Sequence, residues 1–149
     1  MNDPTELGFS SNGPADAQTV ADFRHAFAQW LDDNFALGAD RRSDVLLAMN
    51  EALTNAAEFA YVNSAGPGTM SVTARCDAAD RRLTVWVTDH GTWLERKPDG
   101  RPNTRGRGIE LMHALTDRTT FDRQPTGTRV QLEFNDCALL TQEPYATSA

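Results

Sequence analysis

The stretch Asn50-Glu51-Ala52-Leu53-Thr54-Asn55-Ala56 lies within a predicted helix that has Asp40 as its N-cap and ends near Phe59. Apolar residues recur in this helix at spacings of three and four, which assigns one side to a core: Val45, Leu46, Met49, Ala52, Leu53 and Ala56. Glu51 and Asn55 are four residues apart, so their side chains project from the same side of the helix. Their hard oxygens suit Mg²⁺, and the carboxylate can also accept a proton from an attacking hydroxyl. A solvated polar face is the commoner use of this spacing, so the pair alone does not establish a site.

A second helix is predicted before this one. Its apolar stripe has the same helical spacing and comprises Val20, Phe23, Phe27, Trp30 and Leu31. Asp16 is a suitable N-cap, and Gly38 breaks the pattern after Leu37. The first half of the chain therefore predicts two consecutive helices, each with one buried face.

Extended segments follow the helices. Apolar and polar residues alternate from Met70 to Ala74 and again from Leu83 to Thr88, and the short connection at 77–80 predicts an antiparallel hairpin. A short helix is expected at 109–115 and a last hairpin at 118–134. Helices gathered on one face of such a sheet make an α+β fold, a two-layer α/β sandwich with a mixed, mostly antiparallel sheet.

The ends of the chain carry less pattern than its middle. Residues 1–15 are rich in Asn, Ser, Gly and Pro and are expected to form a flexible N-terminal segment. The domain itself is expected at 16–135, followed by a C-terminal tail at 136–149. The length of 149 residues suits one domain of ordinary size.

Composition excludes several classes of protein. The formal net charge of −7, from 21 acidic and 14 basic residues, argues against nucleic acid as the main partner. No apolar run approaches a membrane span and the N-terminus does not resemble a signal peptide, so a cytoplasmic protein with no membrane partner is expected. The two cysteines, Cys76 and Cys137, belong to no metal-binding cluster and are expected to be free thiols.

Asp89, His90 and Gly91 directly follow the second predicted strand. A carboxylate at the end of a buried strand can accept a hydrogen bond from an exocyclic amine such as that of adenine. The glycine permits a tight turn and close approach of a ligand. Aspartate and glycine also end many ordinary strands, so this signal is weak by itself.

Arg105, Gly106, Arg107 and Gly108 open the short predicted helix, after an aperiodic segment that begins near Trp93. Backbone N–H groups at a helix N-terminus favour anions, and arginine adds charge-assisted donors, so a phosphate site is the natural use. A dinucleotide-binding loop is excluded because no parallel βαβ unit surrounds the glycines, and a Walker A loop because no GKS or GKT is present.

A last motif, Thr126-Gly127-Thr128, enters the final strand, where the Thr128 hydroxyl could bond a base or its neighbouring aspartate. The ordered series is more specific than any member: ExxxN on a helix, DxG after a strand, a basic loop, GxG at a helix start, then GT. This series resembles the GHKL family of ATPases, whose Bergerat fold would cover about Val20 to Phe134. Within this family, the motif Asn-Glu-Ala-Leu-Thr-Asn-Ala resembles that of the anti-sigma factor serine-protein kinases.

The resemblance implies a role for each matching residue, with ATP and Mg²⁺ as cofactors. Glu51 matches the catalytic base and Asn55 the Mg²⁺ ligand, while Asp89, with Gly91 beside it, matches the adenine-binding aspartate. Residues 93–105 correspond to the ATP lid. The remaining matches are the phosphate-contacting glycines and the threonine that supports the adenine contact, with basic neighbours near the phosphates: Gly106, Gly108, Thr128, Arg105 and Arg107. The chain departs from the family in Phe59, where many relatives have histidine, and in Thr92-Trp93 after the adenine turn.

The function implied is that of an anti-sigma factor serine/threonine-protein kinase in transcription regulation and stress response. It would bind ATP-Mg, sequester a sigma factor and phosphorylate a STAS-type anti-anti-sigma factor, commonly as a homodimer. One alternative is a sigma-factor-binding or anti-anti-sigma-binding module without kinase activity. Another is the kinase-like domain of a larger signalling protein. Retention of both Glu51 and Asn55 favours the enzyme.

Overall fold

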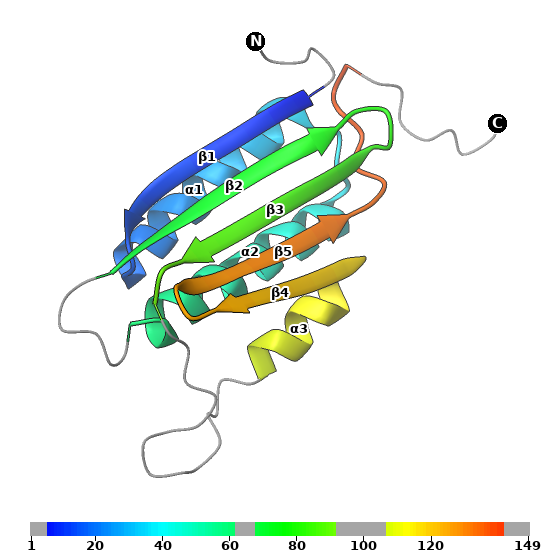
Figure 1. The fold of residues 1–149 in the computed structure, drawn as a ribbon. Helices are drawn as coiled ribbons and strands as arrows, with labels where there is room; N and C mark the ends of the chain where they lie inside the picture. Colours follow the sequence, from blue (N-terminus) through cyan, green and yellow to red (C-terminus); the bar gives the residue numbers. More distant parts are fainter. Residues whose placement is uncertain (1–5, 62–67, 92–106, 142–149) are drawn as a thin grey trace.

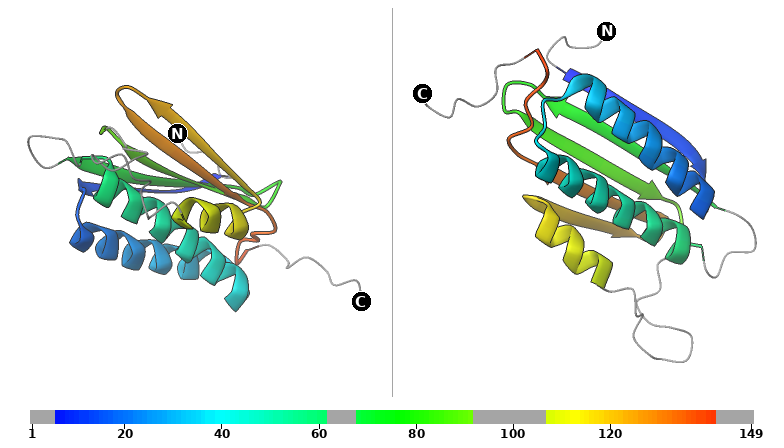
Figure 2. Two further views of the ribbon diagram at one scale, coloured as in Figure 1. Left: turned by 90° about the horizontal axis from the view of Figure 1, so that it is seen from below. Right: turned by 180° about the vertical axis from the view of Figure 1, so that it is seen from behind.

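The computed structural model describes residues 6–61, 68–91 and 107–141 of the chain. Three helices cover one face of a five-stranded sheet, so that the molecule has two layers (Figures 1 and 2). The elements are β1 (Glu6–Pro14), α1 (Ala17–Asn34), α2 (Ala39–Phe59), β2 (Thr69–Asp77), β3 (Arg82–Asp89), α3 (Arg107–Leu115), β4 (Arg118–Gln124) and β5 (Gly127–Phe134). This confirms the predicted α+β two-layer architecture.

The strand order in the sheet is β1-β2-β3-β5-β4, and every described pairing is antiparallel. The expectation of a mixed sheet was therefore wrong for the described strands. The pairs β2–β3 and β4–β5 form hairpins, α1 and α2 connect β1 to β2, and β5 inserts between β3 and β4. Consequently β3 and β5 lie side by side although α3 and β4 separate them along the chain (Figure 1).

The helices begin with different caps. The Asp16 side chain accepts a hydrogen bond of 2.7 Å from the backbone N–H of Thr19, as predicted for an N-cap. For α2 the cap is Gly38, without a side-chain bond, and Asp40 lies inside the first turn. The prediction of an Asp40 cap was wrong by two residues, yet a carboxylate in the first turn still faces the positive end of the helix dipole.

The core lies between the two layers. Alternate residues of β3 are buried, as the period of two requires, and α2 in the middle of the helical layer covers them. At one side Phe9, Phe27 and Trp30 form an aromatic cluster with ring centroids 5.3–5.7 Å apart. Both thiols are free and buried, as expected. Among the described helices, none has the length and apolar character needed to cross a bilayer.

The predicted ends of the domain need correction. Residues 6–14, expected to be flexible, form β1 and pair with β2 along their whole length. This edge strand is rich in serine, asparagine, glycine and proline, so its sequence shows no clear strand pattern. On the C-terminal side, the chain beyond residue 135 pairs back: the N–H of Cys137 donates to the Arg81 carbonyl at 2.8 Å, and Leu139 bridges Phe35. The folded unit therefore extends past both predicted limits.

Candidate functional site

α2 carries Glu51 and Asn55 at the centre of the helical layer. Asn55 is 1% exposed, and its Oδ1 is buried with no hydrogen-bond partner in the part of the chain that the structure describes. A buried amide oxygen without a donor is costly and uncommon, so its presence points to a ligand. An oxygen lone pair of this kind fits a hard cation such as Mg²⁺. Glu51, one helical turn earlier, is half-buried.

Asp89 ends β3 on the same side of the sheet as the helices. Its side chain is 2% exposed, and its Oδ1 accepts hydrogen bonds from the backbone N–H groups of Gly91 at 3.1 Å and Thr128 at 3.3 Å. The strand register places Asp89 directly opposite Thr128, which is also buried. Two backbone donors on one oxygen hold the carboxylate in a fixed orientation.

Two glycines allow three segments of backbone to meet at Asp89. A Cβ on Gly91 would overlap the carbonyl group of Ala60, just past α2, with the carbonyl carbon only 2.5 Å away. Gly127 has a φ of +152°, and a Cβ there would overlap the Asp89 carbonyl and lie 2.9 Å from the His90 Cα. Gly91 is therefore needed for space, and Gly127 for both space and conformation. The end of α2 is brought against the Asp89 turn as a result.

α3 packs beside α2 and begins at Arg107, so the described backbone places Arg107 and Gly108 in its first turn. The N-terminus of a helix favours phosphate groups. Arg105, Gly106 and the segment expected to form the ATP lid lie outside the described residues. Five predicted site residues are thus placed with their side chains, on α2 and at the facing ends of β3 and β5: Glu51, Asn55, Asp89, Gly91 and Thr128.

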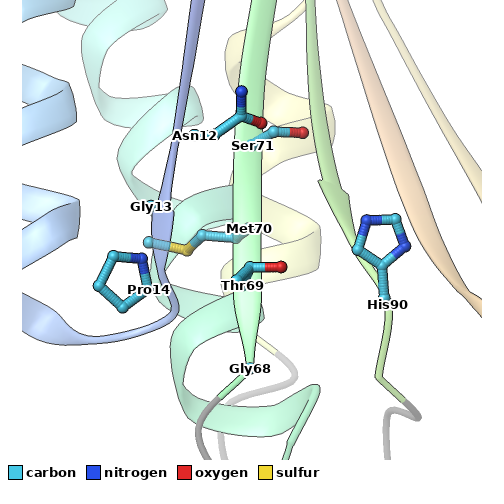
Figure 3. A pocket seen from close by; sticks show the side chains of 8 residues that line it. All are labelled: Asn12, Gly13, Pro14, Gly68, Thr69, Met70, Ser71 and His90. Atoms are coloured by element: carbon cyan, nitrogen blue, oxygen red, sulfur yellow. The ribbon is translucent and has the colours of Figure 1, made fainter.

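Two hollows lie near this end of the sheet. One of about 510 Å³ is lined by polar and apolar residues from the ends of β1 and β2, with His90 at its side (Figure 3). A smaller one of about 210 Å³ lies between the end of β3 and the β4–β5 turn, and it includes Asp89 and Thr128. Asn55 lines neither hollow. The hollow at the end of β3 therefore contains the predicted base-binding residues but neither Glu51 nor Asn55.

Tyr61 also contacts the Asp89 turn, although no sequence pattern predicts this contact. Its hydroxyl accepts a hydrogen bond of 2.8 Å from the N–H of His90, in the middle of the Asp89 turn. The only local signal is an aromatic residue two positions beyond the end of α2. Its partners are distant in sequence, which no helical or strand period reveals.

Comparison with known proteins gives both a sequence family and a fold. A sequence family described as a histidine kinase-like ATPase domain matches residues 13–134. A crystal structure of the RsbU and RsbW domains of Rv1364c from Mycobacterium tuberculosis is similar with a TM-score of 0.67 and 17% identity. That match covers 95% of this chain but 35% of the other, so this chain spans about a third of that length.

A second solved structure is a histidine kinase domain from the Erythrobacter litoralis EL346 blue-light activated histidine kinase. It matches with a TM-score of 0.49 and 20% identity, over 82% of this chain and 61% of that one. The search of curated proteins found no significant match.

Proposed function

Because the chain belongs to the histidine kinase-like ATPase family, we propose that it is an ATP-dependent protein kinase of the anti-sigma factor type. The observation that carries the proposal is the pairing, on one side of α2, of Glu51 with the buried, unpartnered oxygen of Asn55. A domain that only bound a nucleotide base would need the Asp89 turn but not this pair. The fold is similar to that of the solved chain with RsbU and RsbW domains, and this supports the proposed type of kinase.

The residues divide the work between binding and chemistry. Asp89, held by two backbone donors, would accept a hydrogen bond from the adenine amine, and the N-terminus of α3 would face the phosphates. Asn55 Oδ1 would hold Mg²⁺, which neutralises charge on the phosphates when bound. The geometry of Asp89 and Asn55 supports their roles, and the resemblance to the GHKL ATPases supports the role of the α3 N-terminus.

Glu51 would act as the base toward a partner's serine or threonine. Its carboxylate takes the hydroxyl proton while the hydroxyl oxygen forms a bond to the γ-phosphorus. The bond from that phosphorus to the β,γ-bridging oxygen breaks, and ADP leaves with that oxygen. The protein's own contribution is mainly to hold these groups in line.

The partners we propose are a sigma factor, which the chain would sequester, and an anti-anti-sigma factor of the STAS type, which it would phosphorylate. A homodimer in the cytoplasm is the proposed state. One observation favours a variant of this role: the similar chain with RsbU and RsbW domains is much longer than this one. The same domain can therefore serve inside a larger signalling protein.

The test is phosphoryl transfer from γ-labelled ATP, with Mg²⁺, to candidate anti-anti-sigma factors. We expect transfer by the wild type and loss of at least about 100-fold in Glu51→Gln, the usual scale for a general base. Glu58→Gln removes the same charge seven residues later on α2 and serves as the matched control. Transfer that survives Glu51→Gln would exclude the base; ATP binding without transfer to any candidate would favour a nucleotide-dependent binding module.

A further inference from the structure

Tyr61 connects the strands that border the proposed nucleotide site. Its hydroxyl donates to the backbone carbonyl of Thr69 at the start of β2 and accepts from the N–H of His90 just after β3. Figure 3 shows Thr69 at the start of β2 and His90 on the chain just past β3. A phenol has one proton to donate, and here the donor and an acceptor position are both used.

The aromatic ring is as closely held as the hydroxyl. A Cβ on Gly68 would overlap the ring, and a Cβ on Gly91 would lie 3.0 Å from its Cδ1. The ring therefore contacts the backbone on two sides, next to Ala60, which is 1% exposed at the end of α2. Little rotation is open to the side chain in this space.

These contacts bear directly on Asp89. His90 is the residue between Asp89 and Gly91, and the Gly91 N–H is one of the two donors that orient the Asp89 carboxylate. The hydrogen bond from the His90 N–H to Tyr61 holds the Asp89–His90 peptide, and the next peptide, His90–Gly91, carries the N–H that donates to Asp89. Because Tyr61 follows α2 by two residues, it also ties this turn to the helix of Asn55.

We propose that Tyr61 is a positioning residue that sets the orientation of Asp89 and thereby the preference for adenine over guanine. This rests on the proposed nucleotide site. Adenine presents an amine donor to a carboxylate, whereas guanine presents a carbonyl at the same ring position, so only the adenine contact depends on how Asp89 is aimed. Tyr61 does not touch the base; it acts through the His90 peptide.

The experiment compares binding of ADP and GDP to the full chain by calorimetric titration. Tyr61→Phe keeps the ring and removes only the hydroxyl. We expect ADP affinity to fall about five- to tenfold, the scale of one hydrogen bond, with GDP affinity unchanged. The ratio of the two affinities should therefore fall by the same factor. A purely structural role would lower the thermal unfolding midpoint and leave this ratio intact.

Trp86→Phe is the control, because it also removes one hydrogen-bonding group from an aromatic side chain, in this case the indole N–H bonded to Gln131 at 3.1 Å. It should leave the affinity ratio at the wild-type value. Gly68→Ala, which displaces the ring without touching the hydroxyl, should lower the ratio as Tyr61→Phe does, and it decides the matter if Tyr61→Phe does not fold.

The outcomes test the role of Tyr61 and the proposed adenine site separately. An unchanged ratio in Tyr61→Phe, or an equal loss for ADP and GDP, would overturn the role of Tyr61. A wild-type protein that binds neither nucleotide, or binds both equally, would instead overturn the proposed adenine site itself.

Discussion

Replacing Asn55 with leucine separates a ligand-binding asparagine from a structural one. The two side chains have similar size, so the change removes the buried Oδ1 without leaving a large cavity. A buried polar group without a partner costs about 1–3 kcal/mol, and Asn55→Leu should recover a part of that. At roughly 2–4 °C per kcal/mol for a chain of this length, full recovery would raise the thermal unfolding midpoint by about 2–12 °C, and the partial recovery expected here should raise it by less.

The assays are thermal unfolding, which gives the midpoint, and urea unfolding, which gives the free energy, each with and without ATP and Mg²⁺. A ligand at 100 times its Kd stabilises the native state by about 2.7 kcal/mol, so the wild type should gain that amount under such conditions. Asn55→Leu should be more stable than the wild type alone and should gain much less from ATP and Mg²⁺. A variant that becomes stabler while losing its ligand is the expected signature of a functional residue that costs stability.

Asn34→Leu provides the comparison. Asn34 lies at the end of α1, and its Nδ2 donates to the Trp30 carbonyl at 2.8 Å. Asn34→Leu removes this hydrogen bond, so it should destabilise the protein slightly. The stabilisation by ATP and Mg²⁺ should stay unchanged. If Asn55→Leu without ligand proved less stable than the wild type, Asn55 would be a structural residue and its assignment to Mg²⁺ would be wrong.

Three further predictions concern other parts of the fold. Gly127→Ala should destabilise the protein by about 1–3 kcal/mol in urea unfolding, since its φ and its lack of space both oppose a side chain, whereas Gly8→Ala, whose Cβ would meet an ordinary contact at 3.6 Å, should cost far less. The cap hydrogen bonds lower the pKa of Asp16. The stability that the ionised carboxylate adds is therefore complete above the ordinary carboxyl pKa and is lost as the pH falls through the lowered pKa. The difference in unfolding midpoint between the wild type and Asp16→Asn should shrink below about pH 4. Burial raises the pKa of Cys76 and of Cys137 to about 11, so iodoacetamide at pH 8 should label them only after urea is added, and rapid labelling of the native protein would contradict their burial.

Much of the fold could be predicted because its main elements have clear periods. The apolar residues of α2 recur every three or four positions and those of β3 every second, and both patterns reflect burial on one face. β1 could not be predicted in the same way. Its residues are mostly small and polar, and only pairing with β2 makes the segment extended.

In the candidate site too, residues placed by local periodicity could be predicted, and contacts between distant segments could not. The spacing of Glu51 and Asn55 follows from helical geometry, and the DxG turn from the end of a strong strand. The contact of Asp89 with Thr128 depends on β5 inserting beside β3, which the resemblance implied but no local pattern predicts. Tyr61 was missed for the same reason. Arg105 and Gly106 stay predictions from the resemblance.

The hydrogen bond from the Thr128 N–H to Asp89 spans 39 residues of sequence, and this has a consequence for biosynthesis. A ribosome releases Asp89 well before β5, so a nascent chain can pair β1, β2 and β3 while the Asp89 carboxylate still lacks the Thr128 donor. β5 is a late partner because it is the last strand of the sheet to be synthesised. If Asp89 binds adenine as proposed, nucleotide capture would follow the insertion of β5, and occupancy of the site would report that this strand is in place.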